Sequence, residues 1–385
     1  MSVWTTPERQ ALRDMVTSFT EKEIAPHLPA WEDAGETPRE LHKKAADAGL
    51  MGVAFPEEVG GQGGDLIDST IVTESIIEAG GSSGLIAALF THGIALPHIA
   101  RSGNTDLIDR YVRPTLAGDL IGALGVTEPG GGSDVANIRT KAVRDGDEFV
   151  VNGAKTFITS GVRADFVTTA VRTGGEGFGG ISLLVIDKGT PGFTVARPLR
   201  KMGWHCSDTA ELTFDDVRVP AANIVGEVDG GFVLIMQQFV NERLGLAVQA
   251  YATAQRATNL AVEYARQRET FGNPLITRQV IRHKLVDMTR KTAAAKALAH
   301  QAIERAISAE GATSDPSVIL DAVLAKNQAV EACEWVVSEA VQIFGGTGYM
   351  RESEIDRHYR DARILGIGGG ATEVLNDLAA KLLGF

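Results

Sequence analysis

The chain has 385 residues, more than one hydrophobic core usually organises, so we expect two or three domains. Its formal net charge of −12 argues against nucleic acid or an anionic membrane as a partner, because both bind a basic surface. Two cysteines without Cys-x-x-Cys spacing, scattered histidines and no apolar run of membrane-spanning length favour a cytoplasmic protein without disulfides, bound metal or a membrane segment.

The first part of the chain has the pattern of successive helices. Thr6, Pro7 and Glu8 form a helix start, with proline at the first helical position. Apolar residues then recur at helical spacing, and prolines and glycine pairs interrupt the later segments. We therefore predict an N-terminal α-helical domain over residues 1–118.

The middle of the chain changes to short β-branched or alternating runs that turns separate closely. The clearest strands are 165–172, 181–187 and 211–215. Between residues 149 and 159, the dipeptide Asn152-Gly153 predicts a hairpin turn that joins two strands. We predict a small central β-domain over residues 119–226.

The last part of the chain, residues 227–385, returns to helical patterns. The predicted helices run from about Phe232 to Gln267, then to about Glu310 with an end at Gly311, from Asp315-Pro316 to Gly345-Gly346, and from about Glu373 to Leu383. Long amphipathic helices with short connections indicate a four-helix bundle.

A glycine-rich stretch between residues 122 and 134 is the first candidate for a ligand site. An apolar run leads into Gly130, Gly131 and Gly132, where the backbone can approach a ligand closely. Ser133 and Asp134 follow with side-chain oxygen atoms. By itself this pattern fits an ordinary glycine loop equally well.

Five sequence blocks together resemble the acyl-CoA dehydrogenase family. They are Thr127-Glu-Pro-Gly-Gly-Gly-Ser-Asp134, Asn152-Gly-Ala-Lys-Thr-Phe-Ile-Thr159, Phe214-Asp-Asp-Val-Arg-Val-Pro220, Arg268-Glu-Thr-Phe-Gly272 and Gln342-Ile-Phe-Gly-Gly-Thr-Gly-Tyr349. The resemblance covers nearly the whole chain. It implies a mainly α fold with a central, inserted β-barrel-like domain, a C-terminal four-helix bundle, and FAD between the β-domain and the bundle.

The resemblance also implies a reaction and partners. The family removes the α-proton and the β-hydride of an acyl-CoA thioester and forms a trans-2-enoyl-CoA, in fatty-acid or branched-acyl catabolism. The flavin carries the redox chemistry, and the protein supplies a base and a dry slot. An electron-transfer flavoprotein then accepts the electrons, and the enzyme is a homotetramer built as a dimer of dimers.

The catalytic base is where this sequence departs from most of the family. Most members carry the catalytic glutamate before the last helix, where this chain has Gly369. The long-chain and isovaleryl-CoA types place it on the first long bundle helix, just before an arginine, which matches Glu242 and Arg243. We also expect Gly370 and Ala371 to leave room for a glutamate introduced at position 369.

The pattern around Glu242 gives separate support. At helical spacing Glu242 shares a stripe with Ile235, Phe239 and Leu246. A carboxylate within an apolar stripe is costly unless it is paired or functional. The alternative is a buried structural glutamate that pairs with an arginine, or a helix rotated so that Glu242 is solvated.

The resemblance assigns further positions, residue by residue. Flavin contacts are implied for Leu124, Val126, Thr127, Ser133, Phe157, Ile158 and Thr159. Contacts with the parts of FAD outside the flavin ring are implied for a further set of residues, several of which would reach the FAD of a neighbouring subunit. These residues are Arg268, Thr270, Phe271, Gln279, Gln342, Gly345, Gly346, Thr372 and Glu373. The acyl-CoA positions are Ser133, Phe239, Asn241, Arg243 and Gly370.

Two other functions remain open from the sequence. One is a flavin oxidase or monooxygenase on the same fold that uses oxygen directly. The other is a non-catalytic binding protein on this fold, against which Glu242 and the net charge of −12 both argue. Neither the length nor the branching of the acyl chain is readable from the sequence.

Overall fold

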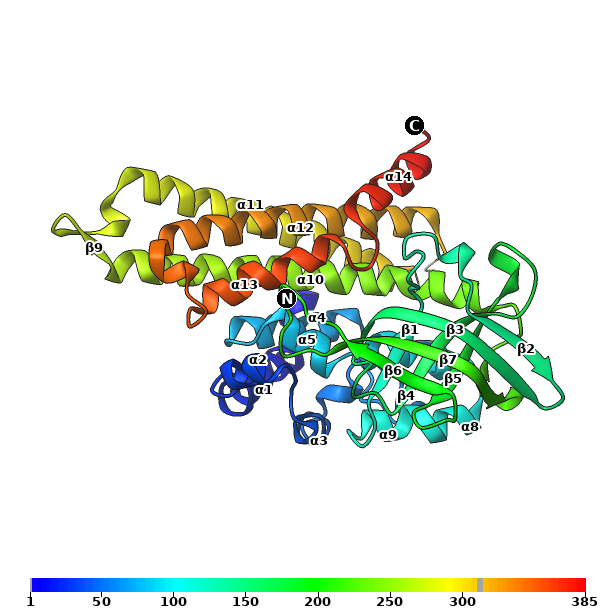
Figure 1. Ribbon diagram of the computed structural model, residues 1–385. Helices are drawn as coiled ribbons and strands as arrows, with labels where there is room; N and C mark the ends of the chain where they lie inside the picture. Colours follow the sequence, from blue (N-terminus) through cyan, green and yellow to red (C-terminus); the bar gives the residue numbers. More distant parts are fainter. Residues whose placement is uncertain (1, 310–313) are drawn as a thin grey trace.

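The computed structural model describes residues 2–309 and 314–385. The chain forms three regions in sequence order: a set of helices, a β-sheet and a bundle of long helices. Figure 1 shows α10, α11 and α12 side by side, the sheet against the end where α10 begins, and the N-terminal helices along the same side of α10. This architecture agrees with the fold class expected from the sequence.

Short helices make up the N-terminal region. Their bounds are α1 Pro7–Glu23, α2 Leu28–Ala34, α3 Arg39–Asp47, α4 Leu66–Glu78, α5 Ser83–Leu89, α6 His92–Ala95, α7 Pro97–Arg101, α8 Thr105–Leu107 and α9 Arg113–Leu116. Helix α1 starts where the sequence predicts, and the Thr6 hydroxyl accepts from the Arg9 N–H at 3.3 Å. No single helix in the described residues is long and apolar enough to cross a membrane, and α5 with residues 92–101 passes that test only as a pair bent by 61°.

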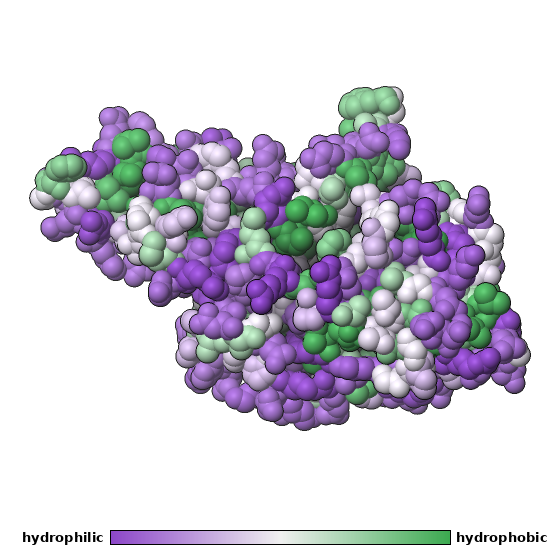
Figure 2. Space-filling model, viewed as in Figure 1, coloured by the Kyte–Doolittle hydropathy of each residue, from purple (hydrophilic) through white to green (hydrophobic). Residues whose placement is uncertain are grey.

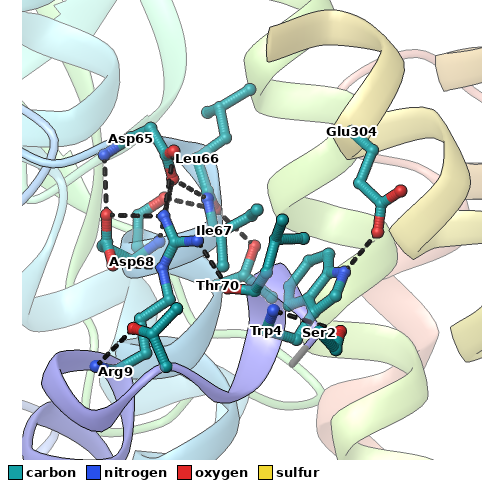
Figure 3. Close-up of polar contacts among 12 residues, drawn as sticks. Ser2, Trp4, Arg9, Asp65, Leu66, Ile67, Asp68, Thr70 and Glu304 are labelled. Atoms are coloured by element: carbon teal, nitrogen blue, oxygen red, sulfur yellow. Dashed lines mark hydrogen bonds and ion pairs between the residues drawn. The ribbon is translucent and has the colours of Figure 1, made fainter. Parts of the chain in front are cut away.

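An arginine fixes the start of α4, which later forms a wall of the candidate site. Asp65 and Asp68 form a capping box at this helix start, and Arg9 donates to both carboxylates at 2.9 Å. In Figure 3 the guanidinium lies between the two carboxylates, and the Thr70 hydroxyl points back to the Leu66 carbonyl. This fork of charge-assisted bonds holds the first turn of α4 against α1.

One eight-stranded sheet forms the middle of the molecule. Its strands are β1 Gly122–Gly125, β2 Lys141–Asp145, β3 Glu148–Thr159, β4 Phe166–Arg172, β5 Ile181–Asp187, β6 Phe193–Pro198, β7 Thr209–Pro220 and β8 Ile224–Val225. The order is β6-β7-β3-β2-β4-β5-β8, and β1 pairs in parallel with β4. Six residues of β4 and six of β5 are buried in succession, because helices cover one face while the other face packs within the sheet domain.

The predicted hairpin at Asn152-Gly153 is wrong, because β3 continues through both residues. The Asn152 amide donates to Asp216 on β7 at 2.9 Å and accepts from the Asp216 N–H at 2.9 Å. The register against β7 shifts between Val151 and Gly153, so this dipeptide makes a bulge inside a long strand. The turn lies earlier, between β2 and β3, where Gly146 has a φ of 62°.

Long helices make up the C-terminal region. They are α10 Gly231–Gln267, α11 Gln279–Ser308, α12 Pro316–Phe344, α13 Glu354–Ala362 and α14 Thr372–Leu383, and the small strands β9 Glu269–Thr270 and β10 Asn273–Pro274 join α10 to α11. Asp315 caps α12 as predicted, since its side chain accepts from the Ser317 N–H at 2.8 Å. The predicted end of the second helix at Gly311 lies outside the described residues. Buried alanines along α10 and α12 let the two helices pack closely.

Candidate active site

A cavity of about 1290 Å³ opens between the sheet, the N-terminal helices and α10. Ligand sites of a single small molecule usually enclose about 300–1,000 Å³. This cavity therefore has room for two ligand parts, such as a flat cofactor and the acyl chain of a substrate. Its walls come from all three regions of the chain, so the fold must be complete before the site exists.

The structure brings most of the predicted flavin and substrate positions to this one cavity. Among the predicted positions, those that line it are Leu124, Val126, Thr127, Ser133, Phe157, Ile158, Thr159, Phe239, Asn241, Glu242 and Gly370. Arg243 does not line the cavity. Its guanidinium lies over the Phe239 ring, with 5.3 Å between the Cζ atom and the ring centroid. The sequence blocks around residues 127 and 157 therefore meet α10 across the cavity.

A buried ion pair anchors the glycine turn that follows β1. Lys155 donates to the Glu128 carboxylate at 2.8 Å and to the Val126 carbonyl at 3.0 Å. Glu128 also accepts from the backbone N–H groups of Arg139 and Thr140. Burial lowers the pKa of Lys155 to about 8, against the opposing charge of Glu128. Both residues stand inside the sequence blocks, but neither was predicted as a site residue.

Phe157 presents an unusual aromatic surface to the cavity. Its backbone has a φ of 59°, a left-handed conformation that bulky residues rarely adopt, and its side chain is 67% exposed. Strain of this kind is found where a ligand contact needs it. An exposed ring beside Ile158 and Thr159 at the cavity wall fits packing against a flat, aromatic cofactor.

Glu242 projects from α10 into the cavity without a partner. Its carboxylate forms no ion pair or hydrogen bond within residues 2–309 and 314–385, which argues against a structural glutamate paired with arginine. Burial raises the pKa of Glu242 above its ordinary value, and the charges of Arg243 and Lys326 oppose part of that rise. The arrangement provides a carboxylate whose affinity for a proton is raised, as a general base requires.

Gly369 and Glu242 face the same space. A Cβ atom at position 369 would stand 3.5 Å from Glu242 Oε1. A glutamate at position 369 would be strained, because its Cβ would stand 2.4 Å from Leu246 Cδ1, which would have to move, and Gly369 has a φ of 63°. Leu246 fills the room that a side chain at position 369 would need.

Two cations hold the loop that carries Gly369. Lys326 of α12 is fully buried and donates to the carbonyl oxygens of Gly368 at 2.7 Å and Gly370 at 2.5 Å. Arg243 donates to the carbonyl oxygen of Gly369 at 3.5 Å. Burial lowers the pKa of Lys326 to about 8, while Glu242 opposes the shift. Lys326 could not be assigned a role from the sequence, because a lysine among buried apolar residues of a helix is its only signal there.

The remaining predicted cofactor positions do not line the cavity, although Thr372 and Glu373 directly follow Ala371, which does. Arg268, Thr270 and Phe271 belong to the turn between α10 and α11, which Figure 1 shows at the opposite end of the bundle from the sheet. The other members are on the first turns of α11 and α14 or at the end of α12: Gln279, Gln342, Gly345, Gly346, Thr372 and Glu373. A single copy of the chain does not bring these residues to the cavity, so their contact with FAD stays a prediction.

The comparisons with known proteins decide the family. Three family models match the chain: the N-terminal domain of acyl-CoA dehydrogenase at residues 6–119, the middle domain at 123–217 and the C-terminal domain at 229–384. The chain belongs to the acyl-CoA dehydrogenase family. The resemblance drawn from the five sequence blocks is therefore confirmed, and the chain is a flavoprotein oxidoreductase of this family.

The similarity extends over whole chains. A probable acyl-CoA dehydrogenase of Bacillus subtilis is 36% identical over 98% of both chains, and a mouse mitochondrial long-chain specific acyl-CoA dehydrogenase is 37% identical over 97% of this chain and 86% of its own. A solved structure of a probable acyl CoA dehydrogenase from Mycobacterium abscessus is 65% identical, with a TM-score of 0.97 over 99% of this chain and 100% of its own. A glutaryl-CoA dehydrogenase from Mycobacterium smegmatis, solved with FADH2, is 26% identical with a TM-score of 0.91 over 99% and 95% of the two chains.

FAD is the cofactor of this acyl-CoA dehydrogenase family, and the residues present fit it. The cavity size, the exposed Phe157 ring and the anchored glycine turn together provide a slot for a flat, polar cofactor beside α10. The described residues contain no group of three or more histidine, cysteine, aspartate or glutamate side chains placed to hold a metal ion.

Proposed function

We propose that the protein oxidises a fatty acyl-CoA to its trans-2-enoyl-CoA, with Glu242 as the base that removes the α-proton. The observation that carries this proposal is the unpaired Glu242 carboxylate in the cavity, 3.5 Å from the place of a Cβ at position 369. The family places its glutamate at either of these two positions. The mouse relative's long-chain specificity supports a fatty acyl group as the substrate.

Each wall of the cavity has a part in the proposed mechanism. Leu124, Val126, Thr127, Ser133 and the 157–159 segment would hold FAD, which supplies the hydride-accepting chemistry when bound. Glu242 is half-buried at the cavity wall. With FAD and substrate bound, the neighbouring apolar side chains, Leu246 among them, would exclude water from its carboxylate and keep its affinity for a proton high. The carboxylate then takes the proton from the carbon next to the thioester carbonyl and holds it at Oε1 or Oε2.

The loop carbonyls and their cations position this chemistry. Lys326 and Arg243 bind three successive carbonyl oxygens, so the Gly368–Gly370 backbone cannot collapse onto Glu242. The residues that we propose to contact the CoA thioester are Ser133, Phe239, Asn241, Arg243 and Gly370. We further propose an electron-transfer flavoprotein as the electron acceptor and a homotetramer as the assembly, both from family membership.

The test compares two glutamates of α10. Glu242→Gln keeps the side-chain shape but removes the proton acceptor, so turnover of acyl-CoA should fall by at least about 10²-fold while FAD stays bound. Glu263→Gln changes an exposed glutamate of the same helix and should turn over like the wild type. Near wild-type turnover in Glu242→Gln with FAD bound would falsify the assignment of the base.

A second measurement separates the proposed enzyme from an oxidase. The substrate-reduced protein is mixed rapidly with oxygen and, in a parallel experiment, with an electron-transfer flavoprotein. We expect slow reoxidation by oxygen and fast reoxidation by the flavoprotein. The opposite order would favour a flavin oxidase or monooxygenase on the same fold.

A further inference from the structure

Helix α10 has a glycine at a position where neither its backbone nor its packing requires one. Gly245 lies in the interior of the helix, and its φ is not in the left-handed region. A Cβ atom built on it would meet no atom within 4 Å beyond its chain neighbours and the helix backbone. Glycine within a helix lowers the stability of that helix relative to alanine. The protein alone therefore gains nothing from this glycine, which leaves a bound ligand as the reason for the open space.

The space beside Gly245 belongs to the cavity that Glu242 lines. Both residues line it, and Gly245 follows Glu242 by three positions, so the two lie on one face of α10, about 4.5 Å apart along the helix axis. Gly245 is partly exposed, whereas its chain neighbours Leu244 and Leu246 are buried. A ligand whose reacting carbon lies at Glu242 can therefore contact the α10 backbone at Gly245.

Helices α4 and α11 face this part of α10. Tyr251 of α10 donates to Glu74 at 2.9 Å, and Arg256 donates to the Glu78 carbonyl at 3.0 Å, so α4 and α10 advance in the same direction. The Tyr251 hydroxyl also lies 3.3 Å from His300 Nε2 of α11. The residues of α4 that precede Glu74 thus face the residues of α10 that precede Tyr251, and α11 passes at the same level.

Uncharged side chains form the wall that these two helices contribute. They are Leu66, Ser69, Thr70, Val72 and Thr73 of α4 and Ile303 of α11. The hydroxyls of Ser69 and Thr70 are bonded to the Leu66 carbonyl at 3.1 and 2.6 Å, as Figure 3 shows for Thr70. This wall suits an alkyl chain, because it offers apolar contacts and two of its hydroxyls are already paired.

The wall on the other side of Glu242 is polar. Gln238, one turn closer to the start of α10, accepts a hydrogen bond from Arg101 at 3.2 Å, and both residues line the cavity. A cation is a suitable neighbour for the phosphate-bearing CoA arm and a poor one for an alkyl chain. The acyl chain should therefore extend from Glu242 toward Gly245.

We propose that Gly245 sets the length of the acyl chain that the enzyme accepts, by leaving the α10 backbone open where the chain passes from Glu242 toward α4 and α11. The preferred substrate is then an acyl-CoA of medium chain length or longer, because a short acyl group leaves this space empty. This role of Gly245 rests on the proposed dehydrogenation, since Glu242 fixes the position of the α-carbon.

The experiment compares acyl chains of three lengths. The kcat/KM values for butanoyl-, octanoyl- and dodecanoyl-CoA are measured with FAD-loaded protein and an artificial electron acceptor. The wild type should prefer the two longer chains by about tenfold or more, because methylene groups buried in an apolar pocket add to transition-state binding. The affinities for the corresponding trans-2-enoyl-CoAs, measured by the change in flavin absorbance, report chain binding without turnover.

Two variants fill the space in steps, and a third is the control. Gly245→Val should lower the ratio of dodecanoyl to butanoyl kcat/KM by at least about tenfold, and Gly245→Ala should lower it less. Both should melt no lower than the wild type, because alanine and valine favour a helix more than glycine does. Gly179 lies in the short helical turn Phe178–Gly180, outside the cavity, and its Cβ would also meet no atom within 4 Å. Gly179→Val should therefore keep the wild-type ratio.

The outcomes separate this role of Gly245 from the proposed function. If the wild type prefers butanoyl-CoA, or if Gly245→Val keeps the wild-type ratio, the role is overturned and the dehydrogenase proposal stands. If Gly245→Ala melts below the wild type, packing requires the glycine, and the role is overturned as well. If the wild type oxidises no acyl-CoA while Gly245→Val still loses affinity for the longer enoyl-CoAs alone, the proposed function fails and the position of the chain over Gly245 holds.

Discussion

At the scale of single residues, the charges around Glu242 oppose one another. Burial disfavours the ionised carboxylate, and the nearby cations Arg243 and Lys326 favour it. The pKa of Lys326 is subject to two opposing effects as well, since burial disfavours its positive charge and the Glu242 carboxylate favours it. The pKa of the proposed base is therefore set by groups on α10 and α12 together, and it stands above the ordinary value for glutamate.

The pH dependence of activity tests this balance. A base acts in its deprotonated form, so kcat/KM should rise with pH through the raised pKa of Glu242 and level off above it. In Lys326→Met the stabilising positive charge is gone, so the pKa of Glu242 should rise further and the acidic limb should move to higher pH. The measurement is kcat/KM against pH for both proteins.

The control for that profile is an exposed lysine. Lys381 lies on α14 beside Asp377, outside the cavity, and Lys381→Met should leave the acidic limb in place. If the acidic limb of the kcat/KM profile does not move in Lys326→Met either, Lys326 does not affect the pKa of Glu242. Its role would then be to bond the loop carbonyls.

At the scale of elements, the Gly368–Gly370 loop depends on one backbone conformation. Gly369→Ala places a Cβ against Leu246 and keeps a left-handed residue, which costs about 1–2 kcal/mol for a non-glycine. We expect a lower melting temperature and lower kcat/KM. Gly368→Ala is the matched control, because its Cβ would meet only the Ile364 carbonyl at 3.5 Å. Equal effects of the two variants would contradict the role of Leu246.

The sequence predicts elements well where one signal dominates. The start of α1 at Pro7 and the Asp315 cap of α12 follow from local chemistry, and the structure has both. The Asn152-Gly153 turn was predicted wrongly because a long partner strand, with Asp216 bonded to Asn152, outweighs the local turn preference. Such pairing between distant strands is not visible in a local pattern.

The candidate site divides in the same way. The family resemblance led to Glu242 and to the residues around Phe157, and the cavity gathers them. Lys326 was missed because its significance depends on the loop carbonyls that it bonds. In sequence it is one polar residue on a long helix, and the loop that it holds is more than forty residues away.

At the scale of the whole molecule, apolar side chains are exposed at both ends of the bundle. Figure 2 shows hydrophobic atoms near β9 at one end of the bundle and along α14 at the other. Phe271 is 96% exposed, and Phe385 at the end of the chain is 91% exposed. Exposed aromatic side chains at the ends of a bundle favour contact with another copy of the chain. The predicted cross-subunit positions Arg268 and Thr270 lie next to Phe271.

The last prediction tests whether a second copy completes the cofactor site. If Arg268 bonds FAD across a subunit interface, Arg268→Ala should weaken FAD binding by about 1–3 kcal/mol, the cost of leaving a polar group unpaired. Arg266→Ala removes an equal charge from an exposed residue in the last turn of α10 and should leave FAD affinity unchanged. FAD titration of the stripped proteins gives the affinities, and light scattering gives their masses. A weakened affinity at unchanged mass locates the effect at the FAD contact itself, whereas unchanged affinity in Arg268→Ala would show that Arg268 does not bind FAD across the interface.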